Sequence, residues 1–167
     1  MIGSFAVGSM MVGSTFGGSL IARGRLKILN LAAYIGIIGV SLTLILLPGQ
    51  LDLSLILILT GRLVYGFATG LIAVAMPRYM DEVLPSKLIG LYGGLYCFSF
   101  AIATIMAYFL ALGLPEDKDA NGNENTQALL DDQFWRVIFG LPILFFLIQI
   151  FMMNTICKYE SPKFLIL

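Results

Sequence analysis

Residues 61–85 read GRLVYGFATGLIAVAMPRYMDEVLP, an arginine followed by a long apolar run that ends in a cluster of charged residues. The apolar run also extends upstream, so that from Leu53 to Met76 there are 24 residues in which Arg62 carries the only charge. As a helix, a segment of this length crosses a hydrocarbon core of about 30 Å. The stretch therefore predicts a transmembrane helix with a charge inside it.

Arg62 lies nine residues after Leu53, a helical rise of roughly 13 Å, which puts the guanidinium well inside the bilayer. Insertion scales give a cost of about 2.5 to 3.5 kcal/mol for an arginine at such a depth. Charged residues in this position usually face the interior of a helix bundle or an aqueous path. We therefore expect Arg62 to face a partner or water and not lipid.

The composition of the whole chain also indicates an integral membrane protein. Hydrophobic residues make up 59% and charged residues 12%, and the mean hydropathy is +0.93. A soluble domain carries about 25% charged residues. The net charge is zero and there is no basic stripe, which argues against a nucleic-acid partner.

Catalytic and metal-binding groups are scarce in this sequence. Histidine is absent, and Cys97 and Cys157 both lie in apolar runs, so neither a disulfide framework nor a CxxC metal site can form. Within the apolar runs the reactive groups are Arg62, these two thiols and scattered hydroxyls, which do not make up an acid, a base and a nucleophile. We predict a protein that is not an enzyme and has no cofactor or metal.

Hydropathy predicts an all-α membrane protein with five apolar segments of spanning length: residues 2–22, 28–47, 53–76, 88–114 and 135–157. The first segment has small residues at four-residue spacing, which allow two membrane helices to approach closely: Ser4 and Gly8, Gly13 and Gly17, Ser14 and Gly18. A signal peptide is the competing interpretation of this segment, but the run is too long and lacks a basic start. We expect turns at residues 23–27 and 48–52 and a polar loop at 78–87, with 115–133 as the one sizeable loop.

The basic residues of these connections are distributed unevenly, which predicts the orientation in the membrane. Only Lys118 and Arg136 fall on one side. The other side holds seven basic residues and is predicted to be cytoplasmic: Arg23, Arg25, Lys27, Arg78, Lys87, Lys158 and Lys163. We therefore expect loop 115–133 and the amino terminus outside and the carboxy terminus inside, in the plasma membrane.

Three motifs occur in an order that is similar to one transporter family. The first follows the first apolar segment: Gly17, Gly18, Arg23, Gly24 and Arg25. The second frames the third segment: Gly61, Arg62, Pro77, Tyr79, Glu82, Pro85 and Gly90. The third frames the last segment: Trp135, Arg136, Gly140, Pro142, Glu160, Ser161, Pro162, Lys163, Phe164 and Leu165. Over essentially its whole length the chain resembles the sugar porters of the major facilitator superfamily.

The resemblance implies that the five segments are spans two to six of a twelve-span fold, a partial amino-terminal half. The first span and the carboxy-terminal half of the same transporter would then lie outside this sequence. It also implies transport of a hexose-like sugar by alternating access, with or without proton coupling. A non-transporting sensor or regulatory partner built on half a transporter fold is the alternative function.

The resemblance also assigns roles to charged residues. Arg62 would serve in coupling or gating, with an acidic partner on the first span; the alternative is a structural arginine hydrogen-bonded to carbonyl groups of neighbouring helices. A cytoplasmic gate network would join two acids, Glu82 and Glu160, to three basic residues: Arg23, Arg25 and Lys163. The alternative for these residues is solvated loop charges, whose pairs contribute about 0 to 1 kcal/mol.

Some positions depart from the family pattern. Ala22, Leu26 and Ile89 replace polar residues of the motifs, and Cys97 stands where the hexose porters have a glutamine that contacts sugar. A thiol is a weaker hydrogen-bonding group than an amide, so the sugar contact would be lost or changed. Helical spacing nevertheless puts four residues on one face that either lines the solute pathway or packs on other helices: Cys97, Phe100, Thr104 and Tyr108.

Overall fold

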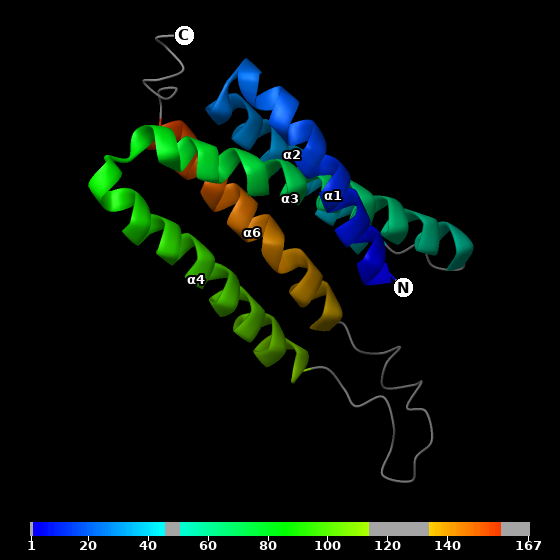
Figure 1. Cartoon of the computed structure of the whole chain (residues 1–167). Helices are drawn as coiled ribbons and strands as arrows, with labels where there is room; N and C mark the ends of the chain where they lie inside the picture. The colour runs from blue at the N-terminus through cyan, green and yellow to red at the C-terminus, as the bar shows by residue number, and fades with distance from the viewer. Residues whose placement is uncertain (1, 46–50, 114–133, 158–167) are drawn as a thin grey trace.

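The computed structural model describes residues 2–45, 51–113 and 134–157, and it is all-helical over these residues. The helices are α1 (Ile2–Leu20), α2 (Arg25–Leu44), α3 (Leu51–Val83), α4 (Ser86–Ala111) and α6 (Phe134–Thr155), with a 3₁₀ turn η1 (Ile21–Arg23) between the first two. The predicted all-α fold class is confirmed. The start of α1 and the end of α6 lie at opposite ends of the bundle (Figure 1).

Four described stretches are long and apolar enough to cross a membrane: Arg25–Leu44, Leu53–Val83, Ser86–Ala111 and Phe134–Thr155. The expected polar loop at 78–87 is wrong, because α3 continues through Pro77 to Val83 and α4 begins at Ser86. A proline in a helix removes one backbone hydrogen bond, and the surrounding turns keep theirs. The charged residues at the end of α3 are therefore on an ordered helix.

Helices α1 and α3 pack through glycine. A Cβ atom added to Gly13 would collide with the carbonyl oxygen of Phe67, and one added to Gly70 would collide with that of Met10. Gly17 also faces α3, whereas a Cβ on Gly8 or Gly18 would meet nothing within 4 Å. Lipid and side chains are equally apolar, so close backbone approach is what holds such helices together. Only part of the small-residue pattern of residues 2–22 is used in this contact.

Helices α2 and α3 cross at a second pair of glycines, Gly39 and Gly61. A Cβ on Gly39 would lie 2.5 Å from the backbone nitrogen of Tyr65, and one on Gly61 would lie 2.7 Å from the carbonyl oxygen of Gly39. Any larger side chain at either position forces the two backbones apart. This crossing holds the next residue, Arg62, close to α2.

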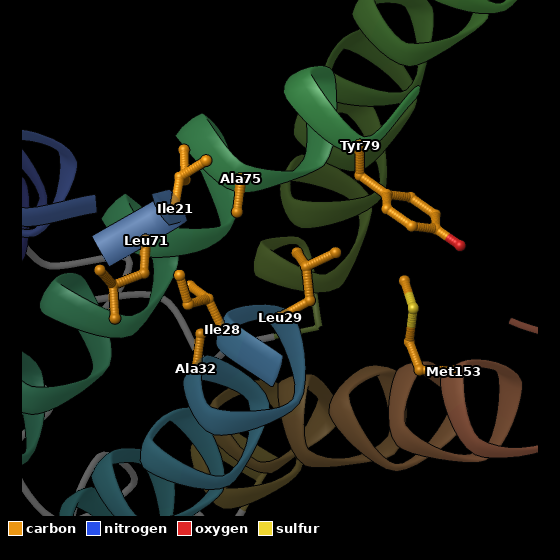
Figure 2. Close-up of a cluster of buried hydrophobic side chains, with 8 residues drawn as sticks. All are labelled: Ile21, Ile28, Leu29, Ala32, Leu71, Ala75, Tyr79 and Met153. Carbon is orange, nitrogen blue, oxygen red and sulfur yellow. The ribbon is translucent and has the colours of Figure 1, made fainter. Parts of the chain in front are cut away.

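The core lies where α2, α3 and α6 meet η1. Figure 2 shows its side chains directed into the space between these elements: Ile21, Ile28, Leu29, Ala32, Leu71, Ala75, Tyr79 and Met153. Leu29 and Leu71 are its largest fully buried side chains. Helix α6 is also tied to α2 by polar contacts, because Gln149 Nε2 donates to the carbonyl oxygen of Leu29 at 3.2 Å. These helices form one packed unit.

Helix α4 is attached differently. None of its residues from Ser86 to Ala111 is buried, and it runs in the opposite direction to α6 (Figure 1). A Cβ added to Gly90, Gly93 or Gly94 would meet nothing within 4 Å, so its glycines make no close helix contact. The weak packing of α4 leaves room between it and the remaining helices.

Candidate functional site

Arg62 projects from α3 into a small cavity of about 180 Å³. The cavity is lined by Val40, Thr43, Arg62, Tyr65, Ile138, Phe139 and Pro142, which come from α2, α3 and α6. The guanidinium carbon lies 4.2 Å from the centroid of the Phe139 ring, a cation–π contact. The Nε atom is buried without a hydrogen-bond partner among the residues that the structure describes. Among the described residues, Nε of Arg62 therefore has no hydrogen-bonded carbonyl, and the guanidinium contacts the Phe139 ring.

A larger cavity of about 710 Å³ adjoins the first and shares Tyr65, Ile138 and Pro142 with it. It lies between α3, α4 and α6, with Met10 of α1 on its wall. Its polar side chains are few: Tyr65, Thr69, Tyr96, Ser99 and Gln149.

Three of these polar groups already donate to backbone carbonyl oxygens. Thr69 Oγ1 donates to the Gly66 carbonyl at 2.8 Å, and Ser99 Oγ donates to the Tyr96 carbonyl at 2.6 Å. Gln149 donates to the α2 backbone, as described above. A sugar requires many convergent donors and acceptors, so this cavity is better suited to apolar side chains.

Of the four residues predicted on one face of α4, only Phe100 lines the large cavity. Cys97, Thr104 and Tyr108 are exposed and turn away from it, about a third of a helical turn around α4. Apart from Phe100, the cavity wall follows a neighbouring face of α4 that was not predicted: Tyr96, Ser99, Ala103, Met106, Ala107 and Leu110. These residues have the same helical spacing as the predicted face, so spacing alone could not choose between the two faces.

The charged residues at the far end of α3 are brought to the start of α2. Arg25 Nη2 lies 2.6 Å from Glu82 Oε1, and the two side chains are 14% and 12% exposed. Gly24 has φ 124°, a value that L side chains rarely adopt, and it makes the turn that presents Arg25. Two members of the expected gate network are therefore in contact. Arg23 ends η1, whereas Glu160 and Lys163 lie outside the described residues.

A family model described as Sugar (and other) transporter matches residues 1–167. The chain belongs to the sugar transporter family. The chain is similar to Hexose transporter 1 of Plasmodium yoelii yoelii. The two are 30% identical over 165 residues, which cover 99% of this chain and 31% of that protein. Facilitated glucose transporter member 2 of solute carrier family 2 from Sus scrofa is 29% identical over 162 residues, 96% of this chain and 27% of that protein. The chain thus spans about a third of the length of these relatives or less.

Solved structures of sugar transporters share the fold. A D-xylose-proton symporter aligns with a TM-score of 0.78 and 21% identity over 99% of this chain and 38% of its own. The inward open xylose transporter XylE from E. coli aligns with a TM-score of 0.77. The predicted partial major facilitator fold is confirmed. The prediction that this protein is not an enzyme is also confirmed, because the related family members are named as transporters.

Proposed function

We propose that this chain forms most of one half of a sugar transporter that moves a hexose-like solute across the plasma membrane by alternating access. The observation that carries the proposal is the match of the sugar transporter family over residues 1–167. Relatives named hexose and glucose transporters favour a hexose as the solute. The half-buried Arg62 beside Tyr65 and Phe139 supports a coupling or gating role, with or without protons.

We also propose which parts of the transporter this chain contacts. The large apolar cavity beside Arg62 is suited to a transmembrane helix, and the first span of the transporter is the proposed occupant. The exposed face of α4 with Cys97, Thr104 and Tyr108 would then be turned toward the solute pathway and the second half. In this arrangement Arg25 and Glu82 lie on the cytoplasmic side, together with Arg23, Glu160 and Lys163.

The test is uptake of labelled glucose by cells that lack their own hexose uptake and express the complete gene product. We expect saturable uptake that unlabelled hexoses compete away more effectively than xylose does. The control is an Arg62→Leu variant at equal surface expression, which should lose concentrative uptake. Surface expression without uptake of any labelled sugar would contradict the proposal and would favour a sensor or regulatory partner.

A further inference from the structure

We propose that Phe139 is a positioning residue that holds the guanidinium of Arg62 at the small cavity. The two residues come from different helices, α3 and α6, and the guanidinium carbon lies 4.2 Å from the ring centroid. Such a contact is strongest with a desolvated cation, and Arg62 is partly buried among apolar side chains. The role of this contact in transport rests on the proposed function, whereas the contact itself does not.

The hydroxyl group of Thr43 does not replace this contact. Thr43 Oγ1, on the α2 wall of the same cavity, donates to the carbonyl oxygen of Val40 at 2.6 Å. The Nε atom of Arg62 has no hydrogen bond among the described residues. A long side chain samples several rotamers, and with Nε not hydrogen-bonded among these residues, the flat face of the Phe139 ring selects the plane in which the guanidinium lies.

This contact also joins α3 to α6, so that a change in the relative position of the two helices would change it. Helix α6 is bound to α2 through Phe146, whose ring occupies the space above Gly36, and through Gln149. Arg62 belongs to α3, whose crossing with α2 is formed by Gly39 and Gly61. A shift of α6 therefore alters the position of Phe139, and with it the orientation of the arginine.

The first experiment measures the arginine directly and does not depend on transport. The complete protein in membranes is treated with phenylglyoxal, and modification of Arg62 is followed by peptide mass spectrometry. We expect Phe139→Leu to raise the modification rate of Arg62 by about two- to thirty-fold, the range that corresponds to a cation–π contact. Phe139→Tyr keeps the ring and should leave the rate unchanged.

Phe151→Leu is the matched control, because Phe151 lies on the same helix and is 64% exposed. It should leave the Arg62 rate at the wild-type value. Equal rates of Arg62 modification in wild type and Phe139→Leu, whether high or zero, would overturn the inference.

The second experiment asks whether Phe139 acts through Arg62 in transport. Phe139→Leu should lower the maximal rate of sugar uptake, and Phe139→Tyr should retain it. In the non-concentrative uptake that remains in an Arg62→Leu protein, Phe139→Leu should have no further effect. Additive losses in the double variant would contradict the positioning role. If the wild type moves no sugar but its Arg62 is protected by Phe139, the proposed function fails while the positioning stands.

Discussion

The guanidinium of Arg25 lies 2.6 Å from the carboxylate of Glu82, so that the first residue of α2 is joined to the last turn of α3. Both side chains are mostly buried by their surroundings. Each charge would be unfavourable at the end of its own helix, because a helix start repels cations and a helix end repels anions. The pair places each charge beside the complementary end of the other helix.

Removing one partner should therefore destabilise the bundle. We expect Arg25→Gln or Glu82→Gln to cost about 1 to 3 kcal/mol, between the values for exposed and buried pairs. The measurement is thermal unfolding of the purified protein in detergent, and the exchanged pair Arg25→Glu with Glu82→Arg should recover part of the loss. Asp81→Asn is the control, since Asp81 is exposed beside the same helix end. A loss with Asp81→Asn equal to that with Glu82→Gln would contradict a specific pair.

Glycine at the α2–α3 crossing should not tolerate a methyl group. We expect Gly61→Ala to lower folded yield and thermal stability, because the new Cβ would lie 2.7 Å from a backbone oxygen of Gly39. Gly90→Ala is the matched control in α4, where no atom lies within 4 Å and alanine favours the helix by roughly 1 kcal/mol. Size-exclusion profiles of the two variants compare them, and an unchanged Gly61→Ala profile would count against the close crossing.

Arg62 should matter more for transport than for folding. We expect Arg62→Leu to reach the surface but to lose concentrative uptake, since removing a charge from the membrane interior relieves its insertion cost. Arg62→Lys should be intermediate, because an ammonium keeps the charge and loses the planar geometry. The measurement is uptake at several external pH values with surface expression in parallel. Loss of expression without a transport defect would instead favour a structural arginine.

Cys97 is exposed, so its predicted place at the position of a sugar-contacting glutamine can be tested by substitution. We expect Cys97→Gln to raise hexose affinity in the complete transporter, because an amide both donates and accepts hydrogen bonds. The inhibition constant of glucose against labelled uptake measures it. Unchanged affinity, together with no effect of thiol reagents at Cys97, would leave this residue a lipid or packing position.

The topology prediction rests on the seven basic residues of one side. A cysteine introduced at Asn123, in the predicted outer loop, should react with an impermeant maleimide on intact cells. Labelling that appears only after permeabilisation would reverse the orientation.

Much of the fold could be predicted because hydropathy marks membrane helices directly. The start of α6 beside Trp135 and the turn at Gly24 follow from motifs in the sequence. The face of α4 that lines the cavity could not be predicted, because a helix in lipid is apolar all round and its pattern does not distinguish packing from lipid contact. The partner of Arg62 was also missed, since Phe139 lies 77 residues away and looks like any other apolar residue of its helix.

Helix α3 extends far beyond its crossing with α2, so that a rotation at the crossing is amplified at the end of α3. Glu82 follows Gly61 by 21 residues, a distance of about 31 Å along the helix. A relative rotation of α2 and α3 by about 10° around that crossing displaces the carboxylate by roughly 5 Å, which is enough to separate it from Arg25. A small angular change at the Gly39–Gly61 crossing would thus make or break one ionic contact at the far end of α3.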